Sequence, residues 1–173
     1  MQQKPRYATT GIVAVLDQPL SPTLHVSVVP IDEAVRALDA VHASARDAFM
    51  RLDAAGAVAL FSPILVYHGV DGRIFDRAAL ARDVATQLGR MHRASSTFTR
   101  ESLDVAADGK SAVEVLNQEA SFEVVAFGLL HRVWSITRRA RYGWSRTDAG
   151  WQVIRVEVLA EQVHALRTWL SFK

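Results

Sequence analysis

One histidine ends a short apolar segment of the sequence, Ile64–His68, and a turn at Gly69–Gly72 follows it. An imidazole has an ordinary pKa near ~6.5, so a histidine beside an apolar cleft is a candidate acid–base catalyst at neutral pH. Alternation along a strand places His68 on the same side as Ile64 and Val66. We expect that side to face the neighbouring helices. The alternative is a histidine at a pocket rim or in a satisfied core position.

Two further polar candidates lie on the predicted strand Ser111–Val125. Val113, Val115, Asn117 and Glu119 share one side of this strand if no bulge intervenes. The two valines indicate that this side faces the core, which would bring the amide and the carboxylate to a pocket. Buried polar groups of this kind need a partner, solvent or a function. The alternative is a bulge near Asn117 that turns both groups towards water.

Large aromatic residues are concentrated on the next predicted strand, Leu130–Arg146. Trp134, Tyr142 and Trp144 share one side, where Trp134 and Tyr142 are candidates for contact with a flat apolar ligand. Such residues are more often core or subunit contacts, and that alternative stays open. The arginines of the same strand alternate between its sides. They favour a solvated face with ion pairs over a nucleic-acid surface.

Several classes of function have no support in the sequence. There is no cysteine, and the remaining histidines show no ligand spacing, so we expect no metal site. Phosphate-loop, dinucleotide and serine-hydrolase motifs are absent as well, and we expect no cofactor. The net charge is only +2. The pI is nevertheless about 9.3, because the basic residues are nearly all arginine, whose guanidinium does not deprotonate. We therefore expect no nucleic-acid partner.

The elements that must position these residues change in type near residue 95. Apolar residues recur at helical spacing from Ile31 to Leu52, a short helical piece follows at Ala57–Phe61, and Asp76 caps a third helix from Arg77 to about Met91. The later period approaches two and predicts long strands, which must twist and curl. These predicted strands are Ser95–Val105, Ser111–Val125, Leu130–Arg146 and Trp151 to about Ala160. The pattern predicts an α+β fold with a strongly curved, mainly antiparallel sheet.

Residues 1–30 are predicted to form an N-terminal arm or hairpin, because two β-like runs flank Pro19 and Pro22. The alternative is an arm exchanged between subunits. Residues 31–173 would then form a single domain. No apolar run approaches the ~20 residues of a membrane span, so we expect a cytoplasmic protein without a membrane partner.

The order and spacing of these elements resemble the nuclear transport factor 2-like superfamily, which includes ketosteroid isomerases and SnoaL-like polyketide cyclases. The resemblance covers about residues 31–160 and describes fold better than activity. It implies a cone-shaped domain, a cystatin-like α+β barrel in which the sheet wraps around three helices and leaves a pocket at its open end. The segments that carry the resemblance are Asp53–Phe61, Val66–His68, Asp71-Gly72 and Asp148–Arg155.

In isomerase-like members the strand after the short helix ends in a catalytic aspartate, and that position falls on His68. The resemblance implies a cofactor-free isomerase, lyase or cyclase that acts on a small apolar substrate. His68 would be its acid–base group, with Asn117, Glu119 or Tyr142 holding an oxygen. Loss of the carboxylate favours the alternative, a non-catalytic ligand-binding or dimerisation domain. The family habit and the two-sided apolar content of Leu130–Arg146 predict a homodimer through the convex sheet face.

Overall fold

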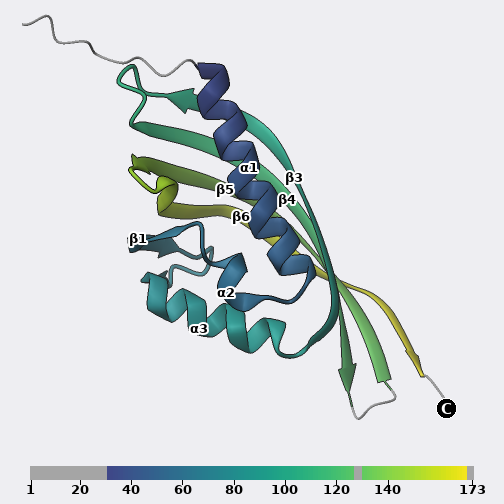
Figure 1. The fold of residues 1–173 in the computed structure, drawn as a ribbon. Helices are drawn as coiled ribbons and strands as arrows, with labels where there is room; N and C mark the ends of the chain where they lie inside the picture. The colour runs from purple at the N-terminus through teal and green to yellow at the C-terminus, as the bar shows by residue number, and fades with distance from the viewer. Residues whose placement is uncertain (1–30, 127–129, 171–173) are drawn as a thin grey trace, which may run out of the picture.

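The computed structural model describes residues 31–126 and 130–170, and it confirms an α+β fold (Figure 1). Helices precede most of the sheet, and the long strands come last, as the change in periodicity predicts. The elements are α1 (Ile31–Met50), α2 (Ala54–Ala57), β1 (Phe61–His68), β2 (Ile74–Phe75), α3 (Arg77–Leu88), β3 (Met91–Val105), β4 (Ser111–Ala126), β5 (Leu130–Thr147) and β6 (Gly150–Leu170).

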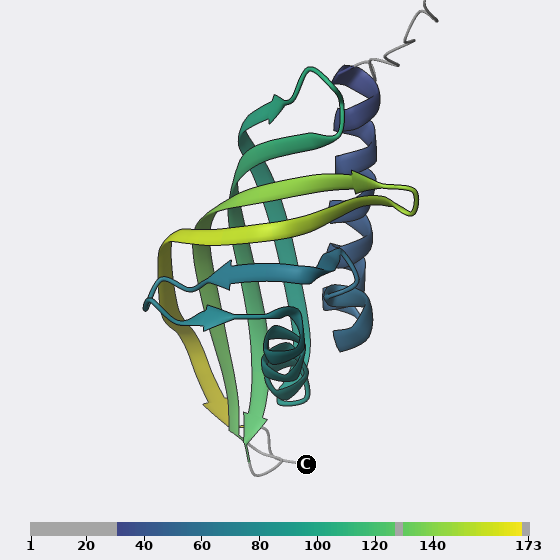
Figure 2. The same cartoon turned by 90° about the vertical axis from the view of Figure 1, so that its left-hand side faces the viewer.

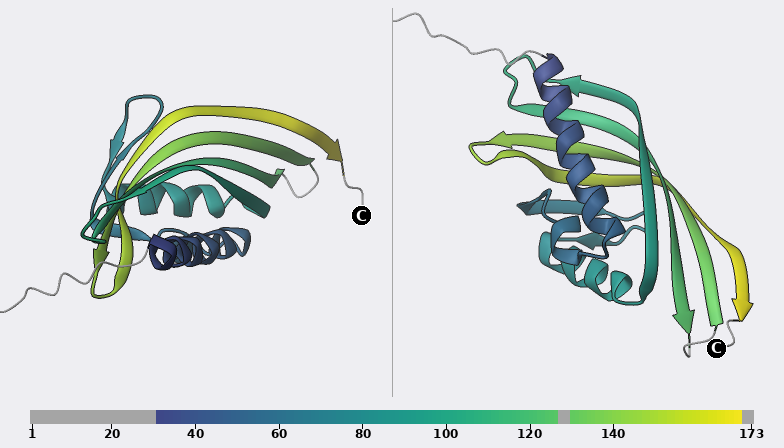
Figure 3. Two further views of the ribbon diagram at one scale, coloured as in Figure 1. Left: turned by 90° about the horizontal axis from the view of Figure 1, so that it is seen from above. Right: turned by 45° about the vertical axis from the view of Figure 1, so that its right-hand side comes forward.

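The strands form one curved sheet in the order β2-β1-β6-β5-β4-β3. Neighbouring strands are antiparallel except for β1, which runs parallel to β6. The sheet does not close into a complete barrel. It arches over α1 and α3, which lie on its concave side (Figures 2 and 3). This arrangement confirms the predicted curved sheet wrapped around the helices.

Local sequence signals set the ends and faces of the helices. Asp76 caps α3, because its Oδ1 accepts a hydrogen bond of 2.7 Å from the backbone N–H of Ala79. The buried positions of α1 include Ala34, Leu38 and His42 at four-residue steps, so one face of this helix packs on the sheet. His42 is thus a polar residue on an otherwise apolar face.

Two register shifts help to bend the sheet. One lies between Arg100 and Ser102 in β3, opposite β4, and the other lies in β6, opposite Gly143 and Trp144 of β5. An extra residue in one strand increases the local twist and bends that strand. The pairing of β4 with β5 continues without a shift from Ser111 to Ala126, so the inner and outer sides of β4 alternate regularly along its length.

The structure departs from the sequence-based expectations at some boundaries. Strand β6 continues to Leu170, well beyond the predicted end near Ala160, and the short strand β2 was not predicted. The far ends of β4, β5 and β6 extend past the helices (Figure 1). The predicted arm at residues 1–30 lies outside the described residues. Of the helices described here, none has the length and apolar character needed to cross a membrane.

Candidate functional site

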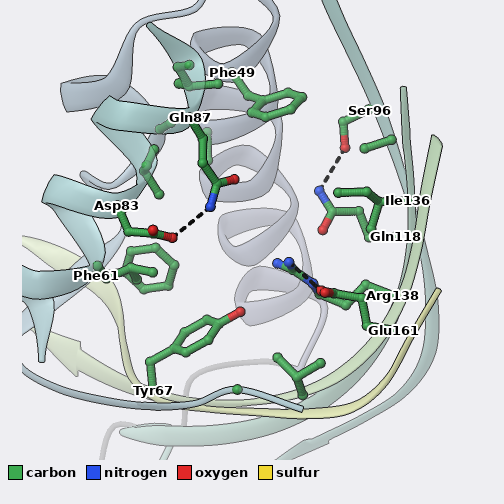
Figure 4. Close-up of a pocket in the computed structure, with 18 of the residues that line it drawn as sticks. Phe49, Phe61, Tyr67, Asp83, Gln87, Ser96, Gln118, Ile136, Arg138 and Glu161 are labelled. Carbon is green, nitrogen blue, oxygen red and sulfur yellow. Dashed lines mark hydrogen bonds and ion pairs between the residues drawn. The ribbon is translucent and has the colours of Figure 1, made fainter. Parts of the chain in front are cut away.

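A cavity of about 280 Å³ lies between the helices and the concave face of the sheet. Its walls are mostly apolar, which suits a small organic molecule better than an ion. The helices contribute Phe49 and Val84, the β1 end contributes Phe61, and the sheet contributes Ile136 and Val158. Figure 4 shows several of these side chains around the central space.

One ion pair projects from the sheet into this cavity (Figure 4). Arg138 Nε on β5 donates a hydrogen bond of 2.6 Å to Glu161 Oε2 on β6. Burial works against the charged guanidinium, but interactions with Tyr67, Glu161 and Tyr142 outweigh it and raise the pKa of Arg138. Arg138 is therefore a permanent cation whose charge is largely balanced by its neighbour.

Two tyrosines stand beside this ion pair. Burial raises the pKa of Tyr67, and it raises the pKa of Tyr142 to about 12. Both phenols therefore keep their protons near neutral pH and remain hydrogen-bond donors. The structure shows no hydrogen bond from either hydroxyl to another described residue, and both side chains line the cavity. They offer two donors to an oxygen atom of a bound molecule.

A buried carboxylate lies deeper, between the sheet and α1. The side chain of Glu114 on β4 is 0% exposed. Glu114 Oε1 accepts a hydrogen bond of 3.0 Å from Trp144 Nε1, and its Oε2 accepts one of 2.9 Å from Arg100 Nε. His42 Nε2 makes a short contact with the same Oε1. Three neighbouring side chains therefore satisfy this carboxylate in the absence of water.

These contacts determine the charge of Glu114. Burial alone would raise its pKa, but the hydrogen bonds and charges of His42 and Arg100 outweigh burial and lower the pKa below its usual value. Arg100 also reaches the surface, where its Nη2 donates a hydrogen bond of 2.7 Å to Asp39 Oδ1. Arg100 therefore links an exposed carboxylate to a buried one, and Glu114 is ionised near neutral pH.

His42 connects this network to the cavity. Its ring packs edge-on against Trp144 and Tyr142, with ring centroids 5.2 Å and 6.0 Å away. Glu114 holds Nε2 of this ring, so Nδ1 is the ring nitrogen that can accept a proton whenever the imidazole is neutral. Within the described part of the chain, Nδ1 has no hydrogen-bond partner. A carboxylate-oriented imidazole at the wall of an apolar cavity has the composition of an acid–base dyad.

Other polar groups of the cavity are already paired (Figure 4). Gln118 Nε2 donates a hydrogen bond of 3.0 Å to Ser96 Oγ, and Gln87 Nε2 donates one of 2.7 Å to Asp83 Oδ2. Among the residues that the structure describes, no group of three metal-ligating side chains comes together. Among the polar groups that line the cavity, His42 and the two tyrosines are therefore the main ones left to form a hydrogen bond with a ligand.

The predicted orientation of His68 is wrong. Along β1 the buried residues are Leu65 and Tyr67, whereas Ile64 and Val66 are 73% and 42% exposed. His68 shares the side of the exposed pair and is not among the residues that line the cavity. The strand is apolar on both sides, so hydrophobicity alone did not decide which side faces the helices. An acid–base role for His68 stays a prediction that a substitution must test.

Asn117 and Glu119 also lie on the side opposite to the one expected. They share one side of β4 as predicted, but the residues that face the helices are the alternate ones, among them Glu114 and Gln118. Val113 is 44% exposed on the outer side. A bulge in β4 is not the cause, since its pairing with β5 is unbroken. On the outer side Val113 is exposed while Val115 is covered, and polar residues face inwards where α1 and β3 supply their partners.

The two aromatic residues predicted for the site differ in whether they line the cavity. Tyr142 lines the cavity, as expected for a ligand-contacting residue. Trp134 is on the same side of β5 as Ile136 and Arg138, which line the cavity. It lies nearer the start of the strand, however, and is not part of the cavity wall. Trp144, which shares this parity, is buried against His42 and Glu114.

Sequence reasoning missed His42, Tyr67, Glu114 and Arg138. A signal existed for His42, because it falls four residues after Leu38 on the apolar stripe of α1. A histidine in that position needs a buried partner. No comparable signal marked Glu114, since its partners come from α1, β3 and β5, which are distant in sequence.

The comparisons with known proteins bear on the fold. No protein-family model matches the chain, and no curated protein matches its sequence significantly. Solved structures do match it. A type 2 hexachlorocyclohexane dehydrochlorinase (LinA) is 10% identical, with 79% of this chain and 91% of that chain covered and a TM-score of 0.62.

Two further structures support the same assignment. A nuclear transport factor 2-like superfamily protein from Salmonella enterica is 15% identical, covers 75% of this chain and 92% of its own, and has a TM-score of 0.58. A candidate scytalone dehydratase from Novosphingobium aromaticivorans is 12% identical, with coverages of 79% and 91% and a TM-score of 0.65. Similarity at such low identity establishes architecture and not activity. The chain has the nuclear transport factor 2-like fold, as its sequence predicted.

Proposed function

We propose that this protein binds a small, largely apolar molecule with an oxygen function in its cone. We further propose that it acts on the molecule by cofactor-free proton transfer, as an isomerase, lyase or cyclase does. The observation that carries the proposal is one mostly apolar cavity lined by His42, Tyr67 and Tyr142, in which His42 Nδ1 and the two hydroxyls make no hydrogen bond to another described residue.

The size and lining of the cavity define the class of ligand. A volume of about 280 Å³ lies at the small end of ligand pockets. The tyrosines donate hydrogen bonds and cannot accept a proton near neutral pH, so they suit a carbonyl, enolate or hydroxyl oxygen. Arg138 adds positive potential behind them, although Glu161 balances most of its charge. A ligand with one oxygen-bearing end and an apolar body fits these walls.

The chemistry follows from the position of His42. Neutral His42, oriented by Glu114, would take a proton from the ligand, and the tyrosine hydroxyls would stabilise the negative charge that develops on its oxygen. This assigns to His42 the acid–base role that the resemblance implied for His68. Two of the similar structures are a dehydrochlorinase and a candidate dehydratase, and both names fit proton-transfer chemistry of this kind.

A non-catalytic binding protein is the second candidate. The observation that favours it is that β1, whose end corresponds to the catalytic aspartate of isomerase-like members, directs His68 away from the cavity. The same cavity and the same tyrosines would then bind a ligand without changing it. Ligand binding alone does not separate the two candidates, whereas proton exchange does.

The test begins with native mass spectrometry of the purified protein, followed by a thermal-shift screen of small aromatic and alicyclic ketones, alcohols and acids. Each hit is incubated with protein in D2O, and deuterium incorporation beside its oxygen function is measured by NMR. We expect His42→Gln to abolish exchange and Tyr142→Phe to reduce it. His68→Ala is the matched histidine control and should leave exchange unchanged.

Three outcomes separate the possibilities. Binding without exchange in the wild-type protein would support the second candidate. Loss of exchange in His68→Ala, with exchange retained in His42→Gln, would return the acid–base role to His68. If no ligand binds, or if binding is indifferent to both Tyr142→Phe and Tyr67→Phe, the cavity is not a ligand site.

A homodimer through the convex face and a cytoplasmic location also remain proposals. Exposed apolar residues on the outer side of the sheet, such as Ile64, Val66 and Val113, support a contact between copies. Sedimentation that shows only monomer at micromolar protein would contradict the dimer.

A further inference from the structure

A second hollow lies on the other side of His42, in the groove between α1 and the strands β3 and β4. Its volume is about 310 Å³. We call it the α1–β3 groove and define it by the residues that face only this hollow, Asp39 and Ala43 on α1, Arg100 on β3 and Leu116 on β4. It is separate from the cavity in the cone, whose mostly apolar walls include residues of β1, α3 and β6.

The two hollows meet at His42. Three residues line both of them, namely His42, Arg46 and Phe98. The ring of His42 packs beside that of Phe98, with centroids 5.5 Å apart. The histidine side chain is 11% exposed, so some of its surface remains accessible although Glu114 holds Nε2. His42 is therefore part of the partition between the cone and the groove.

The groove differs from the cone in polarity. Its rim carries Asp39, whose side chain is 57% exposed, and the Arg100 guanidinium that binds it. Charged groups at an open surface retain water, whereas a ligand that fills an apolar cavity displaces it. A ligand in the cone would close the access to His42 from that side and leave the groove open.

We propose that the α1–β3 groove is a second opening, through which His42 exchanges protons with solvent while a ligand occupies the cone. For the origin of the proton, the inference rests on the proposed function. His42 accepts a proton from the ligand at Nδ1 and becomes imidazolium, and Nδ1 then gives this proton to a water molecule that has entered through the groove, while Nε2 stays bound to Glu114. The water carries the proton to bulk solvent, and neutral His42 is restored. Access of solvent to His42 through the groove does not depend on any reaction in the cone.

The experiment measures the access of a small reagent to His42 in the full chain. The rate of carbethoxylation by diethyl pyrocarbonate is followed by peptide mass spectrometry for the wild-type protein and two matched variants. Ala43 and Ala45 lie on the same helix and are both half-buried, but Ala43 lines only the groove and Ala45 lines only the cone. Ala43→Trp fills the groove, and Ala45→Trp fills the cone.

In the double variant Ala43→Trp/Ala45→Trp, in which both the groove and the cone are filled, we expect modification of His42 to slow by about tenfold or more, because neither opening then admits water-sized molecules. Ala45→Trp should change the rate by less than about twofold, since the groove stays open. His92 and His164, both exposed, are internal references whose rates should not change. Circular dichroism verifies folding, and Ala43→Phe replaces Ala43→Trp if the larger side chain unfolds the protein.

Every other pattern overturns the inference. A reaction that is already as slow in Ala45→Trp as in the double variant would place the access route in the cone, because the groove is still open in Ala45→Trp. An unchanged rate in the double variant would show that neither hollow controls access. None of these results depends on a ligand, so failure of the proposed function and failure of this inference remain distinguishable.

Discussion

The inner and outer faces of the sheet carry similar charged residues in different surroundings. On the outer face, Arg141 NH1 donates a hydrogen bond of 2.8 Å to Glu157, and the two side chains are 50% and 40% exposed. On the inner face, Glu114 is 0% exposed and has contacts from α1, β3 and β5. Both faces therefore have ion pairs, but Glu114 on the inner face is shielded from water, whereas Glu157 on the outer face is not.

This difference changes what an ion pair does. Exposed pairs add little to stability, because water and salt screen them and the long side chains lose freedom. A buried carboxylate must be satisfied completely, since an unpaired charge in the interior is very costly. The inner network therefore specifies how α1 sits on the sheet and how His42 is oriented, whereas the outer pairs are replaceable. The predictions below test this contrast.

The largest effect is expected at Glu114. Glu114→Gln keeps the shape of the side chain but removes the charge that His42 and Arg100 share, so we expect a loss of roughly 3 kcal/mol in the free energy of unfolding. Urea denaturation measures it. Glu119→Gln is the matched control on the exposed side of the same strand and should change stability by less than about 0.5 kcal/mol. Equal effects at the two positions would contradict the contrast between the faces.

The stability difference between wild type and Glu114→Gln should depend on pH. The pKa of Glu114 is lowered in the folded protein, so its contribution is fully present above its unfolded pKa of about 4.3 and is lost as the pH falls through the folded value. The difference between the two proteins should therefore narrow in acid. Urea denaturation from neutral to acidic pH measures it, and a difference that stays constant throughout would show that Glu114 is not ionised in the folded state.

A smaller effect on stability is expected at Tyr142. Its substitution should mainly change the ultraviolet titration of the tyrosine hydroxyls. Burial raises its pKa to about 12, so Tyr142 should ionise after a tyrosine in an ordinary environment. Tyr142→Phe should remove the late step from an ultraviolet titration, and Tyr67→Phe should leave it. If the late step persists in Tyr142→Phe, the hydroxyl of Tyr142 is not the buried donor that the proposed site requires.

The smallest effect is expected on the outer face. A double-mutant cycle on Arg141 and Glu157, with alanine at each position, should give a coupling energy of about 0.5 kcal/mol that declines with added salt. The same cycle on Arg138 and Glu161 should give a larger and less salt-sensitive value, because their side chains are only 29% and 23% exposed. Equal coupling energies for the outer and the inner pair would mean that the two faces do not differ as proposed.

Sequence reasoning succeeded where the determining interactions are local. The cap at Asp76 depends on a backbone N–H three residues away, and the turn predicted at Gly69–Gly72, where Gly72 has a positive φ, follows from turn chemistry within a few residues. The alternation of β4 was also predicted, because the side-chain period of a strand is a property of its own backbone. His42 was recognisable in part, as a residue on the apolar stripe of α1.

The choice of the inner side was decided only in the tertiary structure. Residues Ile64–His68 are apolar on both sides, and Val113–Glu119 carry polar and apolar residues on both sides, so neither pattern selects the inner face. A shift of one residue reverses every side chain. Sheet curvature, the position of α1 and the pairing of β4 with β3 select one side, and they bring Glu114 to His42 and Tyr142 to Arg138. The sequence by itself determined the fold class and the regular alternation, because these arise from short-range geometry. The site arose from contacts between elements far apart in the chain, which no local pattern records.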